Sequence, residues 1–470
     1  MKTSIFREYD IRGIVGKELE ISKVYNLAKA IITYFKKQNP ELNTIILAKD
    51  GRTHSPIIQK YVINAAQDLG INVIDIETCP TPVFYYAIFN LETSVGMIIT
   101  ASHNPKEYNG IKICQNKRPV WGKQIQEIRK IYETKNFIKN KLNKKGIIKK
   151  YNIINDYINF LCSHFSHLKN KSLNAVIDCA NGTAGTIFPQ LIKKMNLKNI
   201  KLLYSEVNGN FPNHPADPTV FENMQDVYKE LKNISSLNVG IGLDGDCDRM
   251  NPITKSGVLV PGDQLLAIFS KKILIDFPNA AIVFDIKSSS SLIELLKAWG
   301  AQDCICPSGH SLVKEAMLKN NAKLAGELSC HFFFNDRYFG YDDGIYACLR
   351  LFEILDESKQ DLDELIKIFP QKYRSPEIRL SCPEENKKII VETVKNFFTT
   401  KHDTKTIIID GIRAQTNYGW GLIRASNTQP VICLRFESDT ANGLKNIKQD
   451  FYNIIKNYFD EKKLREQIGI

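Results

Sequence analysis

The sequence lacks any long uninterrupted hydrophobic run. Its longest apolar stretches, such as Val83 to Phe89, are far shorter than the roughly 18 residues that a membrane-spanning helix needs. The first ten residues, Met1 to Asp10, carry charges where a secretory signal peptide has its apolar region. These two absences predict a cytoplasmic protein that has no membrane partner.

The sequence also lacks a C-x-x-C pair. Its 11 cysteines are odd in number and scattered through apolar runs, and the closest two, Cys304 and Cys306, have one residue between them. This spacing suits neither a redox-active dithiol nor half of a zinc site. We therefore expect buried, reduced thiols.

No residue class dominates the composition. Hydrophobic residues are 43% and charged residues 24% of the 470, which is ordinary globular usage, and this length predicts roughly three or four domains. The net charge of +12 would suit a nucleic-acid-binding protein with lysines and aromatics on one face. No nucleic-acid-binding motif appears, and lysine is abundant in general, as in residues 135–150 with seven lysines. We expect no nucleic-acid partner.

Short runs rich in β-branched residues recur along the chain, each followed by a Gly/Asn/Asp turn and a helical pattern. The clearest are Thr44–Ala48, Ser94–Thr100, Asn174–Asp178, Asn238–Leu243 and Ala281–Ile286. Runs that are apolar on both faces fit parallel strands covered by helices. Ligands of such proteins bind in the loops at the carboxyl ends of the strands.

Breaks in this pattern divide the chain. They lie at the lysine-rich residues 135–150, at Pro252 with Ser256–Gly257, and near Pro370. After the last break, Thr406–Asp410, Leu422–Arg424 and Val431–Glu437 predict strands, and a single final helix is predicted from the apolar face of residues 444–459. We predict three similar α/β domains with mainly parallel sheets (1–150, 151–254 and 255–369) and a smaller C-terminal α+β domain (370–470).

Three carboxylates follow one predicted strand at alternate positions. Asp244, Asp246 and Asp248 can converge on one Mg²⁺, because oxygen ligands suit this ion and neutralise its charge. An EF-hand is excluded because Arg249 and Lys255 occupy the positions that require Gly and Glu. Two alternatives remain: a solvated acidic turn, and a Mg²⁺-dependent phosphatase with Asp244 as nucleophile.

Ser102 lies between another strand end and an Asn-Pro turn, in Thr100-Ala-Ser-His-Asn-Pro105. An exposed hydroxyl held in this way suits group transfer, although a serine here is more often an ordinary turn residue. His103 would point to the opposite face of an extended segment, so a Ser–His dyad is not expected. The G-x-S-x-G elbow is absent, and the G-x-G-x-x-G match at residues 240–245 is rejected because no helix is predicted to follow it.

Two further polar clusters are less specific. Residues 424–430 combine a guanidinium, hydroxyls and an amide in a loop between strands, which suits phosphate binding but also fits an ordinary hairpin. Residues 326–331, Gly-Glu-Leu-Ser-Cys-His, could bind sugar hydroxyls and are uninformative alone.

Taken together and in this order, the four segments resemble the α-D-phosphohexomutase superfamily, closest to its bacterial phosphomannomutase/phosphoglucomutase branch. The resemblance covers nearly the whole chain, with further matches at Phe6–Gly13, Gly209–Pro215, Gly309–Ser311, Tyr341–Tyr346 and Gly419–Arg424. It implies four domains around a central cleft, each contributing one loop. It also implies an isomerase that interconverts the 6-phosphate and the 1-phosphate of a hexose, mannose and glucose, through a hexose 1,6-bisphosphate.

The resemblance implies a role for each matched residue. Ser102 would be the phosphorylated nucleophile, and a phosphoserine oxygen would hold one Mg²⁺ with Asp244, Asp246 and Asp248. Glu327, Ser329 and His331 would bind the sugar. The substrate phosphate would be bound by Arg424, Ser426, Asn427 and Thr428. The positions lining the cleft would be Tyr9, Arg12, Lys112, Arg249, Lys287 and His310. A monomer is expected.

The charges of this assembly make further predictions. Three carboxylates and a phosphate outweigh one Mg²⁺, so Arg12, Lys112 and Arg249 are expected to surround it. Lys112 is the candidate general base if neighbouring cations lower its pKa, with Arg12 and His310 behind it. Phosphoglucosamine mutase, which shares the serine and metal loops, is the alternative activity.

The sequence departs from the family pattern at three places. Cys247 and Cys330 stand where glycine is usual, and Lys49-Asp-Gly-Arg52 replaces Arg-Asp-x-Arg. Cysteine fits both loops if φ is negative there, whereas a positive φ would strain the backbone.

Overall fold

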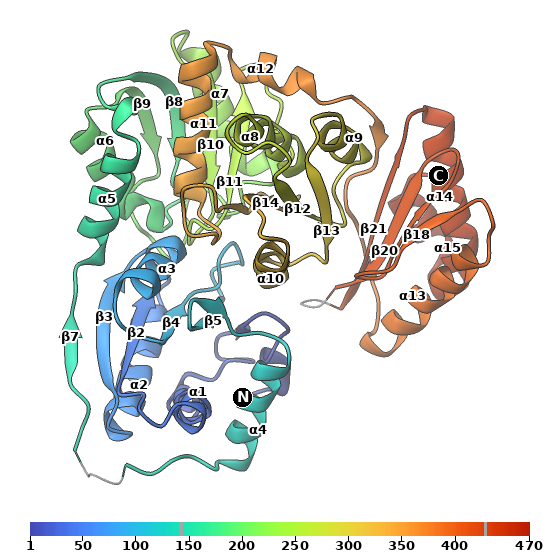
Figure 1. Ribbon diagram of the computed structural model, residues 1–470. Helices are drawn as coiled ribbons and strands as arrows, with labels where there is room; N and C mark the ends of the chain where they lie inside the picture. Colours follow the sequence, from blue (N-terminus) through green and yellow to red (C-terminus); the bar gives the residue numbers. More distant parts are fainter. Residues whose placement is uncertain (141–143, 427–429) are drawn as a thin grey trace. The chain divides into compact units, whose positions relative to one another are not determined.

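A computed structural model describes residues 1–140, 144–426 and 430–470 (Figure 1). The chain forms two compact units. The first comprises Met1–Phe277 and Lys323–Lys367, and the second comprises Pro278–Ala322 and Ile368–Ile470. Within the described residues, no helix combines the length and the hydropathy that crossing a bilayer requires.

The first sheet of the first unit has seven strands in the order β1-β5-β4-β2-β3-β7, with β6 paired to β5. Strand β2 runs parallel to β3 and β4, whereas β5 runs antiparallel to β4 and β1. The strands are β1 Ile11–Ile14, β2 Thr44–Lys49, β3 Asn72–Thr78, β4 Val95–Ile99, β5 Tyr108–Gln115, β6 Arg118–Pro119 and β7 Ile148–Lys150. The helices are α1 Val24–Gln38, α2 Ser55–Asp68, α3 Thr81–Asn90 and α4 Lys123–Thr134, of which α1 packs against α2 and α4.

The second sheet has the order β11-β10-β8-β9, with β8 parallel to β9 and β10, and β11 antiparallel to β10. Its strands are β8 Ser172–Asp178, β9 Lys198–Leu203, β10 Val239–Leu243 and β11 Met250–Thr254, and its helices are α5 Ile153–His164, α6 Phe188–Met195 and α7 Gln225–Asn233. Of the predicted break at Pro252 and Ser256–Gly257, Pro252 itself lies inside β11, whereas Ser256 and Gly257 follow that strand. As an edge strand β11 tolerates the missing N–H, and the chain turns only at Gly257, where φ is +94°.

The remaining elements divide between the units. The first unit holds α8 Gly262–Asp276, the antiparallel pair β14 Leu324–Gly326 and β15 Phe332–Phe334, α11 Gly344–Ser358 and α12 Leu362–Leu365. The second unit holds the parallel pair β12 Ala281–Asp285 and β13 Gln302–Cys306, with α9 Ser290–Ala298 and α10 His310–Asn320.

The C-terminal sheet, also in the second unit, has the order β16-β21-β20-β19-β18, with β17 paired to β21, and its neighbouring strands run antiparallel. Its strands are β16 Tyr373–Arg374, β17 Ile378–Ser381, β18 Lys405–Ile407, β19 Ile412–Gln415, β20 Trp420–Ala425 and β21 Val431–Ser438. Helices α13 Glu384–Thr399 and α14 Ala441–Ile455 pack against each other and against β20. The predicted fold class, three mainly parallel α/β sheets and a C-terminal α+β domain, is confirmed.

The single final helix predicted over residues 444–459 is not one element. Helix α14 ends at Ile455, and a new helix, α15 Glu461–Ile468, follows it. Asp460 caps the start of α15, because its side chain accepts a hydrogen bond from the Lys463 N–H. Tyr458, predicted on the apolar face, is 40% exposed. The spacing of apolar residues continues through the break, so periodicity alone does not reveal it.

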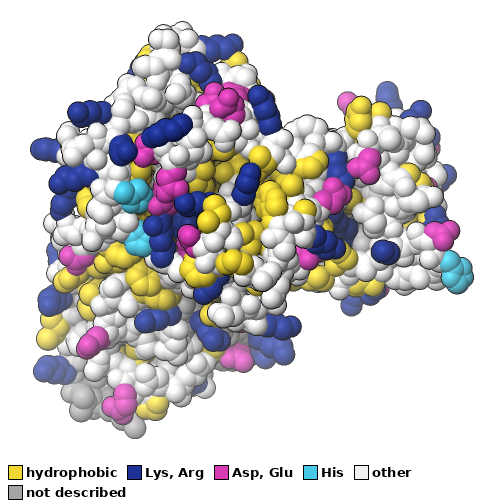
Figure 2. Space-filling view, turned by 45° about the horizontal axis from the view of Figure 1, so that its top comes forward, with side chains coloured by type: hydrophobic (Ala, Val, Ile, Leu, Met, Phe, Trp, Pro, Cys, Tyr) yellow, Lys and Arg dark blue, Asp and Glu magenta, His cyan; other side chains and the backbone are white. Residues whose placement is uncertain are grey.

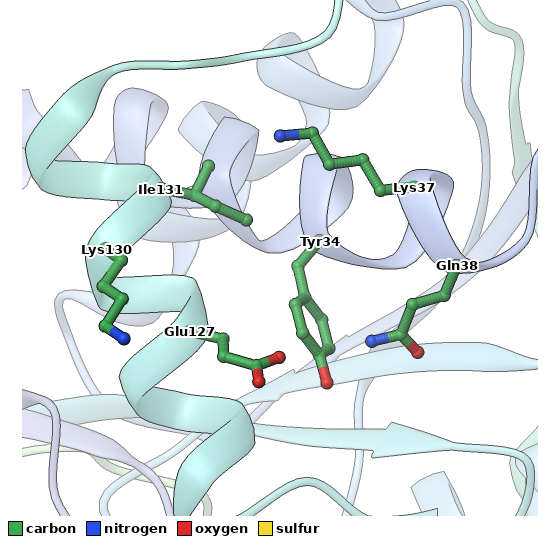
Figure 3. A pocket seen from close by; sticks show the side chains of 6 residues that line it. All are labelled: Tyr34, Lys37, Gln38, Glu127, Lys130 and Ile131. Carbon is green, nitrogen blue, oxygen red and sulfur yellow. The ribbon is translucent and has the colours of Figure 1, made fainter.

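On the face drawn in Figure 2, Lys and Arg side chains are dispersed and stand among Asp, Glu and hydrophobic side chains. A hollow of about 320 Å³ lies between α1 and α4 (Figure 3). Its lining consists of Tyr34, Lys37, Gln38, Glu127, Lys130 and Ile131, none of which belongs to a motif singled out in the sequence.

Candidate active site

Ser102 belongs to the serine loop, residues 100–108, which joins β4 to β5. Its backbone is left-handed, with φ +51°, and its side chain is only 3% exposed. The kink brings the imidazole Nδ1 of His103 to 3.2 Å from Ser102 Oγ. The prediction that His103 points away was therefore wrong, because it assumed an extended backbone.

The acidic turn, residues 244–249, joins β10 to β11. Asp244, Asp246 and Asp248 are at most 1% exposed, and their carboxylate oxygens lie within 4.8 Å of one another. Ser102 Oγ donates a hydrogen bond of 2.7 Å to Asp244 Oδ2, so the structure brings the two motifs together. The turn leads into a strand, which confirms that residues 240–245 open no helix.

The carboxyl groups of the acidic turn differ in their protonation equilibria. Burial, with the nearby charges of Asp248 and Asp246, raises the pKa of Asp244 well above its ordinary value. Burial acts on Asp248 in the same direction, but Lys112 and His331 outweigh it and hold the pKa of Asp248 well below the ordinary value. Nearby cations therefore offset the buried negative charge of Asp248 more fully than that of Asp244.

The acidic turn fits a hard divalent cation. Asp246 Oδ1 is buried and has no hydrogen-bond partner among the described residues, and Asp248 Oδ1 is buried 3.3 Å from the imidazole Nε2 of His331. The other oxygen of Asp246 accepts hydrogen bonds from the hydroxyls of Thr81 and Thr100, at 2.7 and 3.1 Å, which fix the orientation of the carboxylate. Buried, oriented oxygen ligands suit Mg²⁺.

Lys112, on β5, contacts the same carboxylates. Its Nζ donates hydrogen bonds to Asp246 Oδ2 at 2.9 Å and to Asp248 Oδ2 at 2.5 Å. Burial lowers the pKa of Lys112, but the charges of Asp246, Asp248 and Asp342 outweigh it and raise that pKa above its ordinary value. The condition on which Lys112 was a candidate base, a lowered pKa, is therefore not met.

Arg12 and Tyr9 come from the start of the chain. Arg12 Nη1 donates to Asn104 Oδ1 at 2.6 Å and to the Ala101 carbonyl at 3.2 Å, so it contacts the serine loop directly. Its Nη2 pairs with Asp10. Tyr9 is half-buried and precedes β1 by two residues.

The predicted sugar loop joins the acidic turn through His331. Its Nδ1 lies 3.1 Å from Glu327 Oε2 and 3.1 Å from Ser329 Oγ, and its Nε2 lies 3.3 Å from Asp248 Oδ1. Arg249 Nε is also 3.3 Å from that Nε2. Burial lowers the pKa of His331, but the interactions with Asp248 and Glu327 outweigh burial and raise this pKa to about 9. The sequence carried no signal for the contact between His331 and Asp248.

The other predicted residues belong to the second unit. Lys287 Nζ lies 3.5 Å from Asp285 Oδ2 and 3.3 Å from Glu377 Oε2. Arg424 Nε donates to Asp410 Oδ2 at 2.8 Å, and the Ser426 carbonyl accepts from Lys387. His310 begins α10 and is half-buried. Asn427 and Thr428 lie outside the described residues.

Cys247 and Cys330 have positive φ, +63° and +66°, and both are buried. Cys330 Sγ lies 3.2 Å from Asn251 Oδ1, and Cys247 Sγ lies 3.6 Å from Thr183 Oγ1. The backbone is therefore strained at both positions, since a Cβ disfavours the left-handed conformation.

Comparisons with known proteins cover nearly the whole chain. Models described as phosphoglucomutase/phosphomannomutase match in four parts: α/β/α domain I at residues 3–139, domain II at 155–257, domain III at 261–373 and the C-terminal domain at 377–454. Phosphomannomutase/phosphoglucomutase of Pseudomonas aeruginosa is 38% identical over 97% of this chain and 96% of its own length. Phosphoglucomutase of Neisseria gonorrhoeae is 37% identical over 96% of each chain.

Solved structures of related proteins share the fold of this chain over nearly its full length. A phosphoglucomutase/phosphomannomutase family protein from Burkholderia thailandensis superimposes with a TM-score of 0.88 at 31% identity, covering 97% of this chain and 98% of the other. N-acetylphosphoglucosamine mutase of Aspergillus fumigatus shares the fold, with a TM-score of 0.62 at 12% identity over 97% of each chain.

Proposed function

The chain belongs to the phosphoglucomutase/phosphomannomutase family of the α-D-phosphohexomutase superfamily, and we propose that it carries a phosphoryl group on Ser102. It would interconvert hexose 6-phosphate and hexose 1-phosphate through a hexose 1,6-bisphosphate, with mannose and glucose as the sugars. One observation supports this proposal most: Ser102 Oγ lies 2.7 Å from Asp244 Oδ2, inside a buried acidic turn. The two residues are 142 positions apart in the sequence.

The acidic turn and its neighbours would stabilise phosphoryl transfer. Asp244, Asp246 and Asp248 would hold one Mg²⁺ with a phosphoserine oxygen, and the ion would supply positive charge beside the transferring group. Lys112, which donates hydrogen bonds to Asp246 and Asp248, would add positive charge there. Arg249, whose Nε is 4.0 Å from Asp244 Oδ2, adds another.

Proton transfer accompanies each half of the reaction. In the first half the sugar hydroxyl attacks phosphorus and loses its proton, the P–O bond to Ser102 Oγ breaks, and Oγ takes up a proton. In the second half Ser102 Oγ loses that proton as it attacks the other phosphate, and the sugar oxygen that leaves takes one up. His103 Nδ1 lies 3.2 Å from Ser102 Oγ and would accept its proton, while Asp244, at 2.7 Å, would hold the ion. Arg12 and His310 remain the candidates for taking the proton of the sugar hydroxyl.

The remaining predicted residues would bind the substrate. Glu327, Ser329 and His331 would bind the sugar hydroxyls, and Tyr9 would contribute beside Arg12. We define the phosphate clamp as Lys287, Arg424 and Ser426, with Asn427 and Thr428 completing it. Arginine and lysine side chains suit a phosphate that must bind in two orientations, because their charge attracts either end of the bisphosphate.

Intact mass after incubation with glucose 1,6-bisphosphate tests the nucleophile. A fraction heavier by about 80 Da should appear in the wild type and be absent from Ser102→Ala, which should also lose mutase activity. Ser256→Ala, at a serine outside the proposed site, is the control and should gain the mass. A phosphatase using Asp244 would instead leave Ser102→Ala active, and that result would overturn the proposal.

Turnover on three substrates tests the sugar. Relatives at 36–38% identity are called phosphomannomutase/phosphoglucomutase or phosphoglucomutase, which favours mannose and glucose phosphates. Higher kcat/KM on glucosamine 6-phosphate than on mannose 6-phosphate and glucose 6-phosphate would replace this assignment by a phosphoglucosamine mutase.

A further inference from the structure

Arg52 is a buried arginine in the turn between β2 and α2. It is 1% exposed, and a guanidinium removed from water is costly unless its N–H groups all find acceptors. In the sequence Arg52 is distinguished only as the last residue of Lys49-Asp-Gly-Arg, and it has no role in the proposed mechanism.

The guanidinium of Arg52 donates mainly to one loop. Its Nη2 donates to the carbonyls of Ser102 and Asn104 at 2.7 and 2.6 Å. Its Nη1 donates to the carbonyls of Pro105 and Tyr108 at 2.7 and 3.2 Å. These contacts span the serine loop from the nucleophile to the start of β5. One planar group therefore defines the path of this backbone.

A second chain of hydrogen bonds ties Arg52 to the far end of the loop. Asp50 accepts from Arg52 Nε at 3.2 Å and from the Arg52 backbone N–H at 3.0 Å. The same carboxylate accepts from Ser55 Oγ at 2.6 Å, and Ser55 Oγ accepts from Asn109 Nδ2 at 2.9 Å. The guanidinium is thus held in place by a carboxylate that is itself fixed.

The covering segment, residues 206–217 of the second α/β part of the first unit, closes the other side of the Arg52 turn. The guanidinium carbon of Arg52 lies 5.1 Å from the centre of the Phe211 ring. Gly209 approaches the turn so closely that a Cβ there would lie 2.4 Å from the Gly51 carbonyl and 2.6 Å from Arg52 Cα. Water is excluded from the guanidinium, which strengthens its hydrogen bonds to the loop.

We propose that Arg52 is a positioning residue that holds the serine loop, and with it the Ser102 hydroxyl, against the acidic turn. Ser102 has φ +51°, a conformation that costs free energy and persists only where surrounding contacts impose it. The carbonyl of Ser102 is fixed by Arg52, and a Cβ on Gly245 would lie 2.8 Å from the same oxygen. The catalytic consequence of this role rests on the proposed function of Ser102.

Arg52→Lys tests the proposal, because lysine keeps the positive charge but an ammonium cannot span four carbonyls. Displacement of a reacting group by about 1 Å costs about 100-fold in rate, so kcat should fall by about 100-fold while KM changes less than about threefold. The variant should also gain about 80 Da from glucose 1,6-bisphosphate more slowly than the wild type, by the same factor.

Arg350→Lys is the matched control. Arg350 is 3% exposed in the same unit and pairs with Asp336 at 2.8 Å and Glu353 at 3.2 Å. We expect this variant to lose thermal stability but to keep kcat within about threefold, as it leaves the serine loop intact. Equal losses of kcat in the two variants would overturn the positioning role, as would an unchanged kcat in Arg52→Lys.

Amide hydrogen exchange separates this proposal from the proposed function. In Arg52→Lys the serine loop should exchange faster than in the wild type, while α1 and α4 should keep their rates. If the wild type gains no mass on Ser102, the proposed function fails but faster exchange of the loop still supports positioning. If Arg52→Lys does not fold, Phe211→Leu, which removes only the ring over the guanidinium, should lower kcat several-fold, and an unchanged kcat in that variant would refute the proposal.

Discussion

The serine loop with the acidic turn and the phosphate clamp are both sets of charged groups, but they are held differently. In the first, Ser102, Lys112 and the acidic carboxylates are at most 4% exposed. In the second, the side chains of Lys287 and Arg424 are 12% and 9% exposed, and they pair with the carboxylates of Glu377 and Asp410. The proposed nucleophile would benefit from a fixed position, whereas the proposed clamp would have to bind and release phosphate.

Loss of charge in the acidic turn should have the largest effect. Asp246→Asn keeps the shape of a side chain that accepts from Thr81, Thr100 and Lys112 but removes its charge. We expect kcat to fall about 1000-fold and the Mg²⁺ concentration for half-maximal activity to rise at least about tenfold. Calorimetric titration of the protein with Mg²⁺ measures the second effect without turnover. Asp356→Asn, at a carboxylate paired with Lys171, is the control, and equal Mg²⁺ affinity in the two variants would contradict a metal role for Asp246.

Burial without a cation should make stability depend on pH. Burial raises the pKa of Asp343 to about 6, although hydrogen bonds from Tyr346 N–H, Tyr338 and Tyr157 oppose the shift. Because the folded state favours the protonated form, its contribution is full below pH about 4, decreases as pH rises through about 6 and is lost above that. The shift of about two units corresponds to about 3 kcal/mol.

Urea unfolding at several pH values measures this term. Asp343→Asn should unfold with a shallower decline in free energy between pH about 4 and 6 than the wild type. An unchanged slope would mean that other groups dominate. Glu377 provides the contrast. The charge of Lys287 is the main reason that the pKa of Glu377 is lowered to about 2. Arg379 and Arg424 add to this effect, and burial opposes it.

Removing that carboxylate should strengthen the clamp. In Glu377→Gln, Lys287 loses a partner that competes with phosphate, and one charge pair near a surface is worth about 1 kcal/mol, or about fivefold. KM for the hexose phosphate and the dissociation constant for inorganic phosphate should therefore fall about fivefold. Glu294→Gln, at an exposed carboxylate paired with Lys372, is the control. A higher KM would show that Glu377 orients Lys287 instead.

Backbone strain at Cys247 predicts the smallest effect. Since φ there is +63°, Cys247→Gly should be more stable than Cys247→Ala by about 1 kcal/mol in urea unfolding. Cys348 lies in helix α11, where glycine costs more than alanine, so the order should be reversed there by about 1 kcal/mol. The same order at both cysteines would contradict strain at Cys247.

Local patterns predicted much of the fold. The β-branched runs at Thr44 and Asn174 lie in β2 and β8, and the acidic residues follow β10 as expected. The pattern misled where an edge strand tolerates Pro252 and where apolar spacing crosses the end of α14 at Ile455. The spacing of apolar residues does not reveal where a strand lies in its sheet. It also does not reveal where a helix ends.

The site was predicted as a set of residues but not as a set of interactions. The sequence indicated Ser102 and the acidic turn, while it carried no signal for the role of Arg52 or for His331 beside Asp248. The sequence also misplaced His103, because it does not reveal the kink at Ser102. The carbonyl of Ser102 accepts a hydrogen bond from Arg52 in the neighbouring turn, and the His103 ring lies beside Ser102 Oγ.

The sequence by itself determined which segments become strands and helices, and which loops carry charged and hydroxyl groups, because those properties follow from neighbours a few residues apart. Only the tertiary structure decided the conformation of Ser102, the carboxylate partners of Lys112 and the burial of Arg52. Each of these depends on groups from remote segments and on the exclusion of water, which change the energies of charges and hydrogen bonds far more than local sequence does.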